Sequence, residues 1–206
     1  MLSTIQAAGW PIWPLIVCSI LALALIVERF LSLKTAKVAP PHLLQEAISV
    51  SSNGLPSIEV TNQLAQNSAL GEVLAGGLRA MLNEPRITDA DLRATMESTG
   101  RAVAQRLEKS LTALATIASA APLLGLLGTV IGMIEIFGSQ AGGGNNPTVL
   151  AHGISMALYN TAFGLIVAIP ALIFWRYFRS RVDGYLLTLE LSAEQFLRHL
   201  SKQRRA

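Results

Sequence analysis

Charged residues are scarce in this chain. Asp, Glu, Lys and Arg make up 14% of its 206 residues, against about a quarter in soluble domains. In contrast, 51% of the residues are hydrophobic and the mean hydropathy is +0.47. The single cysteine, Cys18, cannot form an internal disulfide and is predicted to pack as a small apolar residue. The composition excludes an ordinary soluble domain and indicates a membrane protein.

Residue patterns that serve catalysis or ligand binding are also missing. His152 and Ser155 stand three residues apart, but no G-x-S-x-G motif and no third triad member accompany them, so we interpret them as capping residues at a helix start. The stretch AGGGNN (141–146) lacks the Lys and Ser/Thr of a phosphate loop and is predicted to be a turn. No His, Cys or carboxylate cluster has metal-ligand spacing. The sequence therefore predicts no enzyme activity, no metal site and no cofactor.

Long intervals without charge predict three membrane spans, because about 20 apolar residues are needed to cross the hydrocarbon core of a bilayer. The predicted transmembrane helices are residues 12–31, 111–137 and 150–175. The turn-rich residues 138–149 join the last two into a helical hairpin. The predicted fold class is an all-α integral membrane protein with three transmembrane helices, long helical extensions and a bundle built from several copies.

The basic residues are distributed on one side only. All 16 Lys and Arg residues follow either the first or the third span. Because inward-facing segments retain an excess of basic residues, the N-terminal residues 1–11 and the hairpin loop are predicted to face outward, and residues 32–110 and 176–206 inward. This placement accounts for the net charge of +3 without a nucleic-acid partner. No basic segment precedes the first span, so we expect it to be retained and not cleaved as a signal.

The inward region is predicted to be helical. Breaks at KVAPPH, SSNGLPS and LNEPRIT leave helices near residues 43–51 and 58–82. Thr88 is predicted to cap a further helix that continues directly into the second span, and residues 176–206 to continue the third span as a tail helix. We expect these long helices to bundle with residues 58–82 and with neighbouring subunits, since an isolated amphipathic helix gains little stability. The alternative is that their charged faces are simply solvated.

Small residues follow one side of each hairpin helix and predict close packing, because helices in lipid associate where their backbones can approach. In the second span these residues are Ala118, Gly125, Thr129 and Gly132, with Gly128 completing a GxxxG motif; in the third they are Ala157, Thr161, Gly164, Ala168 and Ala171.

Glu135 is the one acid among 13 that does not share the inward side. At about 100° per residue it lies within roughly 60° of Gly128 and Gly132 and some 120° from Thr129. An ionisable residue in a spanning helix is by default a candidate for ion or proton transfer. The alternative is that Glu135 reaches water at the outer surface and is solvated there.

The hairpin sequence resembles the paired channel helices of the MotA/TolQ/ExbB proton channel family, and its ExbB branch most closely. The resemblance rests on GTVIGMIEIF (128–137) and HGISMALYNTAFGL (152–165) with their flanking apolar residues. It implies a homopentamer in the bacterial inner membrane, with a periplasmic N-terminus and hairpin loop and a cytoplasmic C-terminus. The pentamer would enclose single-span partners of the ExbD or TolR type, and proton flow would drive a TonB-like protein that energises transport across the outer membrane.

The resemblance also assigns residues. It implies that Thr129 and Thr161 line the proton path near an aspartate of the partner. Family members with GIAEAL or GISEAL have a membrane glutamate where this chain has Met156, so that role does not transfer. We hypothesise that Glu135, at similar depth on the neighbouring helix, takes over part of it, with Asn160 as a polar neighbour one turn inward from Met156. A TolQ-like role in envelope maintenance and a non-conducting membrane scaffold are the alternative functions.

Overall fold

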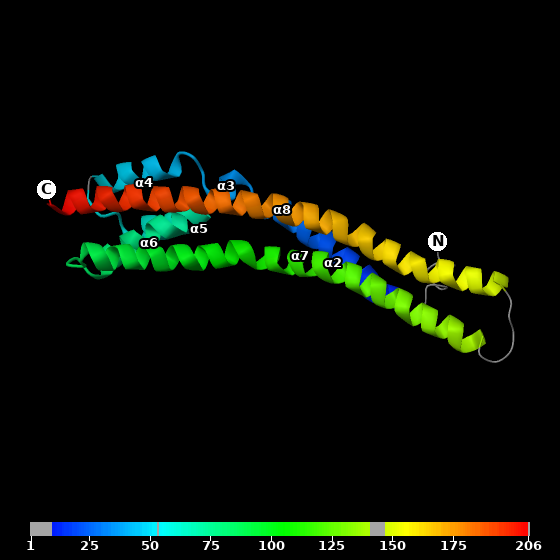
Figure 1. Cartoon of the computed structure of the whole chain (residues 1–206). Coiled ribbons are helices and arrows are strands. Elements are labelled where there is room, and N and C mark those ends of the chain that lie inside the picture. The colour runs from blue at the N-terminus through cyan, green and yellow to red at the C-terminus, as the bar shows by residue number, and fades with distance from the viewer. Residues whose placement is uncertain (1–9, 53, 141–146, 206) are drawn as a thin grey trace. The chain divides into compact units, whose positions relative to one another are not determined.

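The computed structural model describes residues 10–52, 54–140 and 147–205, and among them every regular element is a helix. Three helices are long and apolar enough to cross a membrane: α2 (Ile12–Ser32), α7 (Asp89–Gln140) and α8 (Pro147–Arg205). Four shorter helices lie between the first two: α3 (Thr35–Val38), α4 (Leu43–Ser52), α5 (Ile58–Asn67) and α6 (Ala69–Asn83). The chain is therefore an all-α, multi-pass membrane protein, as predicted (Figure 1).

The chain folds as two compact units. The membrane unit comprises the chain up to Glu28 together with Leu111–Tyr177, and the charged unit comprises Arg29–Ser110 together with Phe178 onward. The helices α2, α7 and α8 each contribute to both units. Within each unit α7 and α8 lie side by side (Figure 1).

The first span has one buried face and one apolar exposed face. Leu15, Ala22 and Ile26 are buried, at near-helical spacing, whereas Ile20 and Leu23 are exposed. In water such an exposed face would be unfavourable, but a bilayer or a neighbouring membrane helix solvates it. The observed helix agrees with the predicted span to within one residue at its C-terminal end.

The two hairpin helices extend further toward each other than predicted. Helix α7 continues to Gln140 and α8 already begins at Pro147, so parts of the predicted loop are helical. Proline at the first helical position is favourable, because its missing N–H would have no partner there. The predicted turn AGGGNN lies outside the described residues, as does most of the predicted N-terminal segment.

The predicted helix over residues 58–82 was wrong in one respect, because it is interrupted at Ser68. This residue is extended (φ −162°, ψ 169°) and ends α5, while its hydroxyl accepts a hydrogen bond from the Gly71 N–H at 3.1 Å and so caps α6. A capping serine satisfies a backbone donor that would otherwise lack a partner at a helix start. The three breaks predicted from Pro- and Gly-rich stretches are confirmed.

The predicted start of α7 is confirmed. Thr88 Oγ1 accepts a hydrogen bond from the Asp91 N–H at 3.1 Å and donates one to the Asp91 carboxylate at 2.6 Å. Asp89 and Asp91 both lie in the first turn, where negative charge is favourable. From this cap α7 continues without interruption through Pro122, and α8 likewise continues through Pro170.

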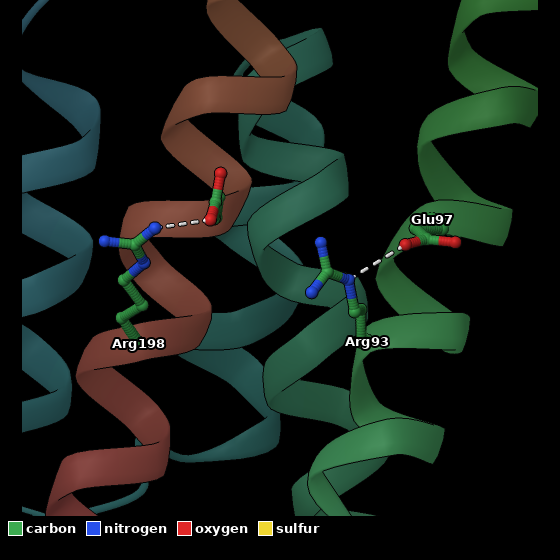
Figure 2. A network of polar contacts seen from close by, with 4 residues as sticks. Arg93, Glu97 and Arg198 are labelled. Carbon is green, nitrogen blue, oxygen red and sulfur yellow. Dashed lines mark hydrogen bonds and ion pairs between the residues drawn. The ribbon is translucent and has the colours of Figure 1, made fainter.

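The helices of the charged unit pack against one another. Beside Gly77 of α6 lies Met96 of α7, and the Tyr185 hydroxyl of α8 donates a hydrogen bond to the Leu33 carbonyl at 2.9 Å. Phe30 and Phe178 meet edge to face, with ring centroids 4.9 Å apart. Exposed ion pairs lie along these helices, such as Arg93 with Glu97 (Figure 2). The apolar faces of these helices are thus partly covered within one chain, whereas Ile58, Leu187 and Leu191 remain exposed.

Candidate functional site

A close contact between the helices of the membrane unit lies at Gly125 and Gly164. A Cβ atom added at Gly125 would lie 2.8 Å from the Asn160 carbonyl oxygen and 3.3 Å from the Gly164 Cα. A Cβ added at Gly164 would lie 2.7 Å from the Ala121 carbonyl oxygen. These neighbours are backbone atoms, which cannot rotate away, so glycine at both positions allows the two helices to meet backbone to backbone.

The contact continues along α7 toward the hairpin end. A Cβ at Gly128 would lie 2.8 Å from the Asn160 Cβ, and one at Gly132 would lie 3.1 Å from the Ala157 Cβ. Asn160 is only 2% exposed, which makes it a buried polar side chain of the membrane unit. The space left by Gly128 is therefore occupied by the side chain of Asn160.

Two threonine hydroxyls lie beside this contact. Thr161 Oγ1 donates a hydrogen bond across the helix pair to the Gly125 carbonyl at 3.2 Å. Thr129 Oγ1 donates to the Leu126 carbonyl of its own helix at 2.7 Å. Both threonines are half-buried, and their hydroxyls bond to consecutive carbonyls of α7. The structure thus brings the two predicted hydroxyl residues to the same level of one helix.

A cavity of about 200 Å³ lies nearer the hairpin end of the same helix pair. Glu135 lines it from α7, Met156 and Asn160 line it from α8, and Pro11 lines it from the residue before α2. Gly128 and Gly132 lie on the same wall as Glu135, as their helical spacing predicts. The cavity therefore contains both Glu135 and Met156, the position to which the resemblance assigns a membrane glutamate.

His152 also lines this cavity, and its predicted capping role was wrong. It lies in the second turn of α8, and the nearby Ser155 hydroxyl donates to the Ala151 carbonyl at 2.9 Å, as an ordinary interior helical serine does. His152, Met156 and Asn160 follow one another at intervals of four residues, which places them on one helical face. That spacing was visible in the sequence and could have identified His152.

Other predicted features give the membrane unit no further chemistry. Cys18 is a free, half-buried thiol. Within the described ranges, no three His, Cys, Asp or Glu side chains are grouped so as to hold a metal ion. The titratable side chains that line the cavity are Glu135 and His152. The arrangement offers a carboxylate, an imidazole, an amide and two hydroxyls along one helix pair, all groups that can bind, donate or accept protons.

A family model described as the MotA/TolQ/ExbB proton channel family matches residues 65–191. This range contains the helix pair, the cavity residues of α7 and α8, both threonines and much of the charged unit.

Curated proteins with names of the same kind are similar over most of the chain or over part of it. The biopolymer transport protein exbB1 of Vibrio cholerae is 37% identical over 173 residues, which is 81% of this chain and 73% of the relative. The ExbB-like biopolymer transport protein 3 of Synechocystis sp. is 33% identical over 193 residues, or 92% of this chain and 89% of the relative. The biopolymer transport protein ExbB of Salmonella typhimurium is 41% identical over 85 residues, which is 41% of this chain and 35% of the relative.

Proposed function

Since the chain belongs to the MotA/TolQ/ExbB proton channel family, we propose that it is the channel and motor subunit of an ExbB-type complex of the bacterial inner membrane. Five copies would enclose single-span partners of the ExbD or TolR type. Proton flow between the copies and the partners would drive a TonB-like protein, and so energise transport across the outer membrane. Similarity to proteins named as biopolymer transport proteins supports this assignment.

One observation carries the proposal at the level of residues: the hydroxyls of Thr129 and Thr161 meet consecutive carbonyls of α7 beside a backbone-to-backbone contact. A hydroxyl can donate and accept, so it can serve a partner carboxyl group in both its charged and its neutral form. The glycine contact holds the α8 hydroxyl against α7 and limits its movement. Such a fixed pair of hydroxyls suits a path in which protons are passed on in steps.

The placement of charge supports the proposed orientation. The N-terminus and the hairpin loop would be periplasmic, because they contain no Lys or Arg. The charged unit would be cytoplasmic, because it carries nearly all of the charged residues. The gradient of a respiring cell would then drive protons from the hairpin end toward the charged unit.

Two other functions compete with this proposal. In a TolQ-like role the same motor would maintain the envelope, and the neighbouring genes distinguish the two: partners of the ExbD and TonB type favour transport, and partners of the TolR, TolA and TolB type favour envelope maintenance. A non-conducting scaffold would explain the absence of an acid at Met156. This last alternative requires that the hydroxyls at Thr129 and Thr161 have no role in proton transfer.

Proton uptake by reconstituted vesicles tests the conducting function. The chain is purified with its co-encoded single-span partner, and flux is compared between the natural complex, Thr129→Ala and Thr161→Val. Thr116→Val is the matched control, since that hydroxyl donates to the Thr112 carbonyl of its own helix at 2.9 Å and is exposed. We expect both site variants to lose flux while the control keeps it. No flux in the natural complex would support the scaffold, and full flux in both site variants would contradict a role of the two hydroxyls in proton transfer.

Assembly is tested on the same sample. Particles with five-fold symmetry around a central helix pair would support the motor, and a purified monomer or dimer would contradict it. Loss of the Thr161 hydrogen bond should change stability little, because bonds of this kind between membrane helices contribute about 0.6 kcal/mol on average. If the Thr161→Val variant forms an intact particle that conducts no protons, the variant has therefore lost proton transfer and not its fold.

A further inference from the structure

The cavity between the hairpin helices is lined by an acid and a base. Neither has a part in the proton path proposed at Thr129 and Thr161. Glu135 and His152 line it from opposite helices, and both side chains are exposed. They are the titratable groups among the described residues that line it, with Pro11 contributing only an apolar wall from the α2 side. A carboxylate and an imidazole that share one cavity can both take up a proton from water.

The volume is sufficient for water. One water molecule occupies about 30 Å³ in the liquid, so a cavity of about 200 Å³ has room for several. The wall is not purely apolar, because Glu135, His152 and Asn160 each supply polar atoms. Polar cavities of this size are filled with water, whereas only apolar ones stay empty.

The lining of the cavity on α8 ends at the residue next to Thr161. His152, Met156 and Asn160 follow one face of α8 at successive turns, from exposed His152 to buried Asn160. The next residue after Asn160 is Thr161, whose hydroxyl bonds to the Gly125 carbonyl. Asn160 therefore lines the cavity, packs beside Gly128 and directly precedes Thr161 in α8.

We propose that this cavity is the outer proton-intake site of the complex. A proton from periplasmic water binds the Glu135 carboxylate or the His152 imidazole, and the same proton then leaves to cavity water held by Asn160 and moves toward Thr161. One proton enters and one leaves, and no electrons are transferred. Histidine is the side chain best suited to such exchange near neutral pH. This inference rests on the proposed function, because it assigns the periplasmic end of that proton path.

Proton flux through the vesicle-reconstituted complex, measured as outer pH is varied from 5 to 8, tests the intake site. The variants are Glu135→Gln, His152→Gln and the double variant. Positioned acid or base groups contribute at least about 100-fold to proton transfer, so we expect the double variant to lose about that factor and His152→Gln to flatten the pH profile. His42→Gln and Glu46→Gln are the controls, since both residues are exposed in the charged unit.

The outcomes separate this inference from the proposed function. If the natural complex conducts and Thr161→Val blocks it, while the double variant conducts with an unchanged pH profile, the intake site is refuted and the proposed function stands. If the natural complex does not conduct at all, both are refuted. Size-exclusion chromatography of each complex shows whether a variant has failed to assemble.

Water access is tested without conduction. In a Cys18→Ser background, Met156→Cys in the assembled complex should react with a membrane-impermeant thiol reagent added from outside, because Met156 lines the cavity. Ala118→Cys is the matched control, as Ala118 is a buried residue of the same unit that does not line this cavity. Labelling of position 156 but not of position 118 supports the intake site. No labelling at position 156 overturns it.

Discussion

Met156 and Glu135 line one cavity from neighbouring helices, and this makes the position of the acid testable. If Glu135 supplies the carboxylate that related proteins have at the Met156 position, a carboxylate on α8 should replace it. We predict that Glu135→Gln loses proton flux and that adding Met156→Glu restores a large part of it. Flux through the vesicle-reconstituted complex is the measurement.

The control for this exchange is a carboxylate on a different face. Leu158→Glu places an acid two residues further along α8, at an exposed position outside the cavity, and should not restore flux to Glu135→Gln. Equal recovery by both acids would mean that only local charge matters, and no recovery by Met156→Glu would contradict the replacement hypothesis.

Glu194 and Arg198 form an exposed ion pair one helical turn apart in α8, at 2.6 Å (Figure 2). The Arg198 guanidinium donates a hydrogen bond to the Glu194 carboxylate and lowers the pKa of that group, and the positive charge of Arg93 acts in the same direction. A lowered folded pKa adds stability above the unfolded pKa, and this stability is lost as pH falls through the folded value.

We therefore predict that Arg198→Gln raises the pKa of Glu194 toward its ordinary value. The variant should melt slightly lower than the natural chain at neutral pH and equally in acid, below the pKa of Glu194. NMR titration of labelled glutamate and melting curves in detergent give the two measurements. Arg93→Gln is the control and should raise the pKa less, because Arg93 acts only through its charge. An equal pKa in the natural chain and in Arg198→Gln would contradict the prediction.

At this scale the helical face of a residue was predictable from the sequence, whereas its neighbours on the other helix were not. Thr129, Thr161, Glu135 and Asn160 were selected from helical spacing and resemblance, and the structure places all four along one helix pair. The place of His152 in the cavity lining follows from its spacing to Met156, four residues on, and not from its spacing to Ser155. The residues of α7 that lie near His152 depend on how α7 and α8 are aligned, and the spacing within one helix does not determine that alignment.

Among the helices, the contact at Gly125 gives the sharpest prediction. A methyl group there would lie within 2.8 Å of a carbonyl oxygen, so Gly125→Ala should force α7 and α8 apart. Overpacking of this kind costs about 1–3 kcal/mol. We expect lower thermal stability of the hairpin in detergent and loss of proton flux.

Gly138→Ala is the matched control on the same helix. Among the described residues beyond its own turn of helix, no atom lies within 4 Å of a Cβ built at Gly138, and alanine is the better helix former by about 1 kcal/mol. This variant should be as stable as the natural chain or more so. If both alanine variants melted alike, the close contact would not contribute to the stability of the hairpin.

Helix boundaries were predictable where the sequence contains strong breaking residues. Pro- and Gly-containing stretches marked the gaps before α4, α5 and α7, and Thr88 marked the start of α7. Ser68 was not recognised, because no Pro or Gly marks that break and serine is tolerated inside helices. The stop there is set by a capping bond to Gly71 and by packing, since a Cβ at Gly71 would clash with the Leu64 carbonyl of the preceding helix.

For the molecule as a whole, the distribution of charge predicts which side of the membrane each part faces. In a Cys18→Ser background, Thr148→Cys near the hairpin end should react with an impermeant thiol reagent in intact spheroplasts. Ser98→Cys in the charged unit should react only after the membrane is opened. Both residues are exposed, so a difference in labelling cannot come from a difference in burial. The opposite pattern would reverse the proposed direction of proton flow.

The number of helices apolar enough to span a membrane followed from composition, because crossing lipid requires an apolar segment of about 20 residues. The copy number could not follow from one chain in the same way. The copy number depends on which exposed apolar faces contact lipid and which contact neighbouring subunits. Ile20 and Leu23 of α2 lie on such a face. Both surroundings are equally apolar, so hydropathy does not distinguish them.

The division of α7 and α8 between two units has a consequence for the order of synthesis. The charged unit is discontinuous: its first part ends at Ser110, and its second begins at Phe178 after both hairpin spans. At about 5–20 residues per second, several seconds pass between the two parts. During this time α6 and the first half of α7 can already pair through Gly77 and Met96. The tail of α8 is made after both hairpin spans, so the charged unit closes only after the whole hairpin has left the ribosome.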